Sequence, residues 1–80
     1  MFNWDEKKNN EIKQRHGISF EQVVIAIEND RVIIDSPNRA RDQKAFLVFI
    51  NDYPVVVPFE IRVGKYKLIT AWPDRRYKNE

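Results

Sequence analysis

Helical periodicity is confined to the first 29 residues, and this division constrains the fold more than any other feature of the sequence. Asp5 is a suitable N-cap for a very polar segment, and Gly17 stands where a helix commonly ends. Ser19 opens an S-x-x-Q capping box in front of an apolar stripe at helical spacing. The sequence therefore predicts two consecutive helices, over residues 5–15 and 19–29.

The remainder of the chain has the pattern of short strands separated by turn residues. Strands are expected over residues 2–4, 31–35, 45–50, 53–63 and 66–72. Because Pro54 and Pro58 cannot donate to a ladder, the strand that contains them is expected to be bulged or partly at an edge. A turn and a polar loop are expected over residues 35–43, and a helical turn or a loose tail over residues 74–80.

This order of elements predicts one α+β domain over residues 1–80, with two helices packed on one face of an antiparallel meander sheet. The opposite face of the sheet is then either covered by a partner or left wet. Hydrophobic residues make up 42% of the chain and charged residues 32%, which is typical of a soluble cytoplasmic domain. No apolar run approaches the roughly 18 residues of a membrane span.

The residue counts exclude several kinds of site. The absence of cysteine removes disulfides, thiolate metal sites and a cysteine nucleophile. Two glycines cannot build a Gly-rich phosphate loop, and one histidine cannot form a histidine-rich metal cage, so we expect no metal and no cofactor. That histidine, His16, is either a general acid or base or a residue that only interacts with the carbonyls at a helix end.

Positive charge is concentrated in the last 19 residues. Residues 1–61 carry eight Lys and Arg against ten Asp and Glu, whereas residues 62–80 carry six against two. A run of cations and aromatic residues contributes to this imbalance, namely Lys65, Tyr66, Lys67, Trp72, Arg75, Arg76 and Tyr77. Arginine matches phosphate geometry and aromatic rings accept stacked bases, so nucleic acid is a suitable partner. A solvated strand edge with a tail, and aromatic residues in the core, would give the same pattern.

These residue types permit the cleavage of RNA without a metal. The 2′-hydroxyl attacks the neighbouring phosphorus, and the protein orients it, transfers protons and stabilises the charge on the phosphorane. Arginine and lysine can provide that stabilisation, and histidine, tyrosine or lysine can transfer protons. The composition therefore permits a ribonuclease without requiring one.

Two N-terminal segments, taken together, resemble the opening of BrnT-like toxins. F-N-W-D-E-K-K-N at residues 2–9 is similar to the F-x-W-D-x-x-K pattern of that family, and K-Q-R-H-G-I-S-F-E at residues 13–21 to its K-H-G-V-S-F-E junction between two helices. The segments 34–37, 44–51 and 57–59 are also similar. The resemblance implies a RelE-like fold and an endoribonuclease toxin of a type II toxin–antitoxin system, which inhibits translation and growth.

The resemblance also implies partners. These are mRNA, free or on the ribosome, and a cognate antitoxin with a ribbon-helix-helix DNA-binding domain. The assembly would be a toxin–antitoxin heterotetramer, or a homodimer of the toxin alone. The antitoxin would neutralise the toxin, and the complex would repress its own operon.

The C-terminal part can be aligned with this family in two registers. In the first, Leu68-Ile69-Thr70-Ala71 matches an I-I-S-A-R ending, and Trp72 then occupies the arginine position. In the second, Pro73-Asp74-Arg75-Arg76 matches a P-S-R-K ending, and Arg75 takes the arginine role. We prefer the second register because it keeps a cation just beyond the last strand.

The leading hypothesis assigns a role to seven residues. Arg75 and Arg76 stabilise the scissile phosphate, and His16 or Tyr77 transfers protons. The RNA backbone is bound by Arg62, Lys65 and Lys67. We expect the last hairpin and the residues after it to gather these cations into one pocket. The alternatives are a catalytically inactive RNA- or protein-binding module of the same fold, and an interaction domain that dimerises through its wet sheet face.

Overall fold

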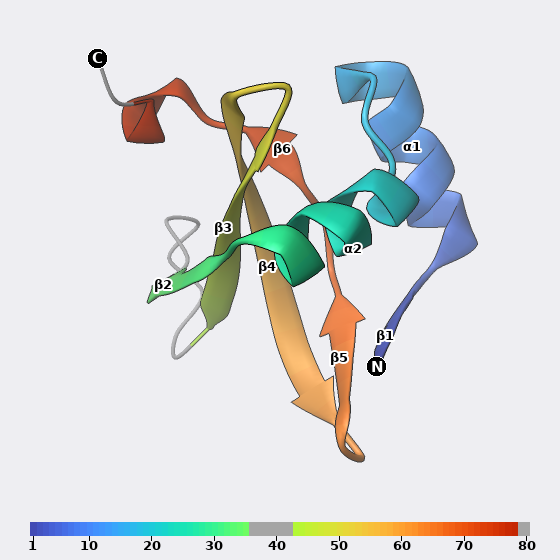
Figure 1. Ribbon diagram of the computed structural model, residues 1–80. Helices are drawn as coiled ribbons and strands as arrows, with labels where there is room; N and C mark the ends of the chain where they lie inside the picture. The colour runs from blue at the N-terminus through green and yellow to red at the C-terminus, as the bar shows by residue number, and fades with distance from the viewer. Residues whose placement is uncertain (36–42, 79–80) are drawn as a thin grey trace.

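The computed structural model describes residues 1–35 and 43–78. In order, their elements are β1 (Phe2–Trp4), α1 (Glu6–His16), α2 (Phe20–Asn29), β2 (Val32–Asp35), β3 (Lys44–Ile50), β4 (Tyr53–Arg62), β5 (Lys65–Leu68), β6 (Trp72–Pro73) and a 3-10 turn, η1 (Arg75–Tyr77). Both helices lie on the same side of the sheet (Figure 1). The α+β prediction is confirmed, whereas most of the predicted turn and polar loop, 36–42, lies outside the described residues.

The helix ends follow the predicted capping signals. The Asp5 side chain accepts a hydrogen bond from the backbone of Lys7, and Gly17 ends α1 with a φ of 72°. This left-handed conformation favours glycine because glycine has no Cβ. Ser19 and Gln22 form both hydrogen bonds of the capping box at the start of α2. The two helices therefore begin and end close to the predicted positions.

A buried asparagine joins α1 to α2. Asn9 is fully buried, and its side-chain oxygen accepts a hydrogen bond of 2.8 Å from the backbone N–H of Phe20. Its amide group donates to the carboxylate of Glu21 at 2.9 Å. Burying this polar side chain costs little free energy, because both its oxygen and its NH2 group have hydrogen-bond partners. Asn9 thereby fixes the first turn of α2 against α1.

The sheet is mixed, so the prediction of a purely antiparallel meander is wrong in one respect. The strand order is β1-β5-β4-β3-β2, and β2 to β5 form the predicted antiparallel meander. The edge strand β1, however, pairs in parallel with β5, with Phe2 opposite Tyr66 and Trp4 opposite Leu68. The chain leaves β1 through the helical layer, and such a crossover allows parallel pairing.

The predicted last strand, 66–72, is divided into β5 and β6 by a bulge. Two residues of β4, Val57 and Pro58, face the three residues 69–71. The Pro58 carbonyl accepts a hydrogen bond from Ile69, so the nitrogen of Pro58 also faces this side and has no hydrogen to donate. The extra residue thus lies in the strand opposite Pro58. β4 itself pairs regularly with β3 and lies inside the sheet, so the expectation that it is bulged or partly at an edge is wrong.

The main core lies between the helices and one face of the sheet. Apolar residues of α2, namely Phe20, Val23 and Ile27, are buried against a cluster that includes Phe46, Val48, Val57 and Phe59. The opposite face carries Ala45, Val56 and Pro58, which are buried as well. The centre of that face is therefore not wet, contrary to the expectation from the sequence.

Candidate nucleic-acid interface

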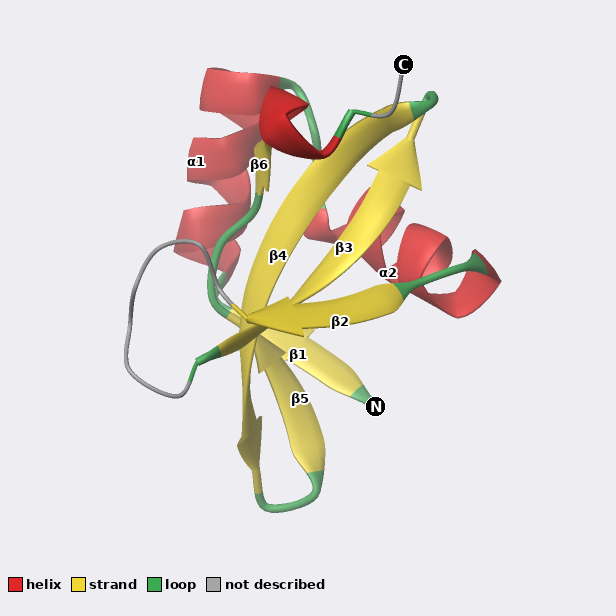
Figure 2. Cartoon of the chain, turned by 90° about the vertical axis from the view of Figure 1, so that its left-hand side faces the viewer, coloured by secondary structure: helices red, strands yellow, loops and turns green. Residues whose placement is uncertain are grey.

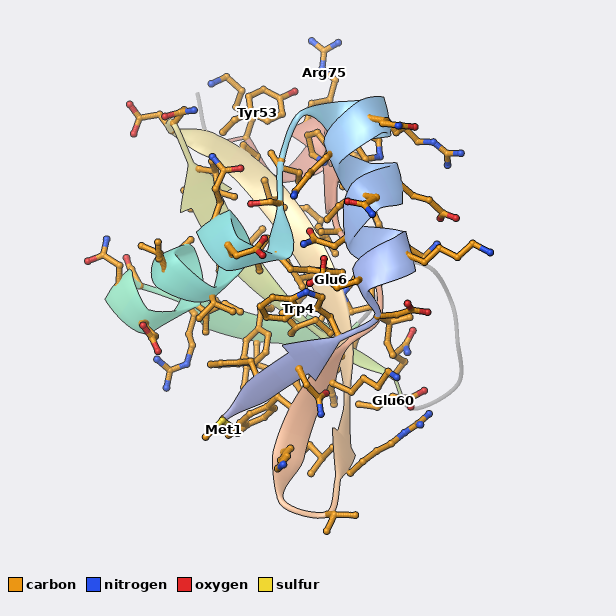
Figure 3. The ribbon with its side chains drawn as sticks, turned by 90° about the vertical axis from the view of Figure 1, so that its right-hand side faces the viewer. Met1, Trp4, Glu6, Tyr53, Glu60 and Arg75 are labelled. Atoms are coloured by element: carbon orange, nitrogen blue, oxygen red, sulfur yellow. The ribbon has the colours of Figure 1, made fainter. Side chains whose placement is uncertain are left out.

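The predicted site residues lie at two opposite ends of β4 and do not form the expected single pocket. Lys65 is opposite Arg62 at one end of the strand, whereas Trp72 is opposite Val56 near the other. At about 3.4 Å per residue, the segment from Val56 to Arg62 spans about 20 Å. In Figure 3, Tyr53 and Arg75 lie at one end of the molecule and Glu60 lies toward the other.

The first end is called the C-terminal cation surface here. It consists of His16, Tyr53, Arg75, Arg76, Tyr77 and Lys78. His16 ends α1 and lines a pocket of about 450 Å³ together with Tyr53, Val55 and Pro73. Helix α1 packs beside β6, and η1 packs beside β4 (Figure 2). The end of α1 and η1 thus lie toward the same end of β4, on either side of the β3–β4 turn in Figure 1.

His16 has the properties of a proton acceptor. Partial burial of the imidazole and the neighbouring charge of Arg15 lower the pKa of His16 below its ordinary value of 6.5. The imidazole is therefore mainly neutral at pH 7 and can take a proton from a hydroxyl group. Among the residues that the structure describes, His16 makes no side-chain hydrogen bond or ion pair.

Three further groups of this surface are available to a phosphate or a base. The Arg75 guanidinium is exposed and makes no ion pair with the described residues 1–35 and 43–78. The ammonium group of Lys78 lies 5.4 Å from the centroid of the Tyr53 ring, a cation–π arrangement. Tyr53 follows the β3–β4 turn and is half-buried. One free guanidinium and one cation on an aromatic face thus lie at the same end of the sheet.

Arg76 is held rigidly by a buried carboxylate. Asp74 is 6% exposed, and its two oxygens accept hydrogen bonds from Nε and Nη2 of Arg76 at 2.9 and 2.7 Å. The backbone N–H of Arg76 and the indole N–H of Trp72 also donate to this carboxylate. The hydrogen bonds from Arg76 are the main reason that the pKa of Asp74 falls to about 2. The Arg76 side chain is still 66% exposed, so its outer edge can meet a ligand.

The second end is the tip of the β4–β5 hairpin, which extends beyond the helices (Figure 1). Arg62 and Lys65 are cross-strand partners, and Lys67 is opposite Glu60, so these side chains share one sheet face. Arg62 forms an ion pair with Glu60. Lys65 and Lys67 make no ion pair within the described part of the chain. The hairpin cations thus form a separate surface, which the helices do not border.

The alternative readings of the aromatic residues are resolved by their positions. Tyr66 is partly buried and packs on the core, with its ring 5.4 Å from that of Phe2. Trp72 is half-buried in β6, and its indole N–H donates a hydrogen bond to Asp74. An uncharged side chain therefore occupies the position just beyond the bulge. Arg75 is the first cation after β6.

Sequence reasoning missed the parts played by Tyr53, Asp74 and Lys78. The signal for Tyr53 was its place directly after the Asn51-Asp52 turn, where a side chain lies at the end of the sheet. The signal for Asp74 was an aspartate directly after Pro73, because aspartate commonly caps the start of a helical turn. In the structure, η1 begins at the next residue. In the sequence, Lys78 is visible only as one of the six cations of residues 62–80.

Comparisons with known proteins do not identify the family. No protein-family model matches the chain, and no curated protein matches it. Among residues 1–35 and 43–78, no group of three or more His, Cys, Asp or Glu side chains is placed to hold a metal ion. Within the same residues, no helix has both the length and the apolar character that a membrane crossing requires.

Proposed function

We propose that the protein is a metal-free endoribonuclease toxin with a RelE-like fold, similar to the BrnT-like family, and that the C-terminal cation surface is its active site. The observation that carries the proposal is that His16 lines a pocket with Tyr53 and Pro73, while Arg75 and the fixed Arg76 follow Pro73 at the same end of the sheet. A neutral proton acceptor and two guanidinium groups are of the kinds that can carry out metal-free RNA cleavage. The sequence resemblance supplies the family and the reaction.

The proposed reaction is an attack of the RNA 2′-hydroxyl on the adjacent phosphorus. His16 takes the proton of this hydroxyl, the 2′-oxygen–phosphorus bond forms, and the bond from phosphorus to the 5′-oxygen breaks. The 5′-oxygen leaves with a proton returned by His16 or supplied by Tyr77, and the products are a cyclic phosphate and a 5′-hydroxyl. Arg75 and Arg76 stabilise the additional negative charge on the phosphorane oxygens.

Arg75 and Arg76 differ in whether their side chains are held in place before RNA binds. Arg76 is fixed by Asp74 before RNA binds, so little side-chain freedom is lost on binding. Arg75 has no such partner among the described residues and points to solvent in Figure 3. Arg75 therefore keeps its full charge for the phosphate, and we assign to it the larger share of the stabilisation.

A cleavage assay with matched variants tests this proposal. Arg75→Ala removes one unpaired cation from the C-terminal cation surface, and Lys65→Ala removes one unpaired cation from the hairpin tip. Arg75→Ala is expected to lower the cleavage rate of single-stranded RNA about 100-fold or more. Lys65→Ala should change it within about threefold, since only a distant, screened charge is lost. Equal effects, or no cleavage by the wild-type protein with or without ribosomes, would contradict the proposal.

The second candidate is a catalytically inactive RNA- or protein-binding module of the same fold. The division of the cations between two surfaces favours it, as does the pairing of Arg76 with Asp74. This candidate predicts salt-dependent RNA binding without cleavage of the chain. For the toxin, we propose a cytoplasmic location and a ribbon-helix-helix antitoxin as partner. A small neighbouring reading frame that encodes such a protein would favour the toxin.

A further inference from the structure

A second pocket lies beside the end of α2, on the sheet face that the helices cover. It has a volume of about 220 Å³. Ile27 and Phe46 are almost fully buried and form its floor. The rings of Phe2 and Tyr66, stacked on each other 5.4 Å apart, form a wall. In Figure 3 the strand β1, with Met1 at its end, lies below α2 and borders this region. Its walls suit a flat, apolar ring face.

Two charged side chains also line this pocket. Glu28 belongs to the last turns of α2, and Arg31 follows the helix. Within the described residues, Glu28 makes no hydrogen bond or ion pair, and Arg31 makes one hydrogen bond, from Nη1 to the carbonyl of Ile27 at 3.4 Å. The two side chains do not pair with each other. A carboxylate and a guanidinium are thus both available to one ligand.

We propose that this pocket binds a guanine base of the RNA, a proposal that rests on the proposed function for the choice of RNA as ligand. Guanine presents two neighbouring donors, N1–H and the 2-amino group, which match the two oxygens of the Glu28 carboxylate. It also presents two neighbouring acceptors, O6 and N7, which match the fork of the Arg31 guanidinium. The purine ring stacks on the aromatic wall.

Other ligands match the pocket less well. A simple cation would be repelled by Arg31, and a simple anion by Glu28. Adenine has one donor group on this edge, so it cannot satisfy both carboxylate oxygens with adjacent donors. Guanine satisfies both the carboxylate and the guanidinium, whereas adenine leaves hydrogen bonds of the carboxylate unmade, so a pocket with both charges favours guanine over adenine.

The pocket is connected to the C-terminal cation surface by a groove along α2. Glu28 lines both this pocket and the groove between α2 and β3. Ile50 lines the same groove and the pocket that contains His16. An RNA strand that follows this groove would place one base in the pocket and another part of the strand near His16. The pocket would then fix the position of cleavage relative to a guanine.

NMR titration with guanosine and adenosine 5′-monophosphates tests this inference, because binding is measured without cleavage. The wild-type protein is expected to bind the guanosine nucleotide about tenfold more tightly or better, with shifts at Phe2, Glu28 and Tyr66. Glu28→Gln should abolish the preference, because the amide keeps one acceptor oxygen and sets a donor NH2 group against the second donor of guanine. Glu11→Gln removes the same charge on the exposed face of α1 and should leave the preference intact.

The possible outcomes separate this inference from the proposed function. Equal affinity for the two nucleotides, or an unchanged preference in Glu28→Gln, would overturn the guanine pocket even if the protein cleaves RNA. Shifts confined to the hairpin tip would overturn it as well. A guanine preference that depends on Glu28 would support the pocket even if the protein cleaves no RNA. In that case the ribonuclease alone would be refuted.

Discussion

Asp74→Asn is expected to destabilise the protein at neutral pH, because it breaks the ion pair that fixes Arg76. The hydrogen bonds from Arg76 lower the pKa of Asp74 from 3.8 to about 2. At about 1.4 kcal/mol for each pKa unit, this difference corresponds to about 2.5 kcal/mol. The Arg76 side chain is 66% exposed and water weakens the pair, so we expect a loss of about 1–2 kcal/mol.

The stabilisation by Asp74 should depend on pH, because its carboxylate has a lower pKa in the folded protein than in the unfolded chain. The folded protein keeps the Asp74 carboxylate ionised down to about pH 2, whereas the unfolded chain takes up the proton near pH 3.8. The stabilisation is therefore present above about pH 4 and is lost as the pH falls from about 4 to about 2. Asp74→Asn lacks this group, so its stability should approach that of the wild type at the acidic end.

Urea unfolding between pH 7 and pH 2 measures this difference. Glu60→Gln is a matched control, because Glu60 also pairs with an arginine two residues later but is 40% exposed. The control should cost less than about 1 kcal/mol. A stabilising role of the Asp74–Arg76 pair would be refuted if Asp74→Asn lowers the free energy of unfolding no more than Glu60→Gln, or if the loss persists unchanged at pH 2.

Three further predictions concern single residues. Val63→Asn should stabilise the fold by about 1–2 kcal/mol in urea unfolding, because Val63 has a φ of 51° in the β4–β5 turn and is 99% exposed; an unchanged midpoint would contradict this. Asn9→Ala should cost about 1–3 kcal/mol, since it leaves the buried N–H of Phe20 unpaired, and the exposed Asn10→Ala should cost under about 0.5 kcal/mol; equal losses would refute this role of Asn9. In pH–rate profiles of RNA cleavage, the rate should rise through a pKa below 6.5 and His16→Gln should lose this rise, whereas a rise centred above 6.5 would contradict the role of His16.

The elements of the fold could be predicted from local signals. Helix caps depend only on residues that are close in the sequence. Each of the predicted caps, Asp5, Gly17 and Ser19, marks a helix boundary in the structure. Asn51 and Asp52 both adopt positive φ in the predicted β3–β4 turn. Such signals act within one turn of chain, so the sequence alone was sufficient for them.

The long-range features could not be predicted in the same way. The parallel pairing of β1 depends on which sheet edge is free once the meander has formed. The burial of Asn9 depends on a tertiary contact, because its hydrogen-bond donor, the Phe20 N–H, belongs to a second helix. Adjacent cations in the sequence were expected in one pocket, but β4 pairs with β5 and β6 over different parts of its length and separates them. The Asp74–Arg76 pair was local, and the short spacing could have indicated it.

We propose that RNA phosphates bind at the C-terminal cation surface and not at the hairpin tip. NMR titration with a guanine-free, 2′-O-methylated oligouridine, which cannot be cleaved by its own 2′-oxygen, tests this claim most directly. Binding at the C-terminal cation surface should give the largest shifts at His16, Tyr53 and Arg75, and these shifts should be lost in Arg75→Ala. Largest shifts at residues 61–65, or no shifts at low salt, would contradict it.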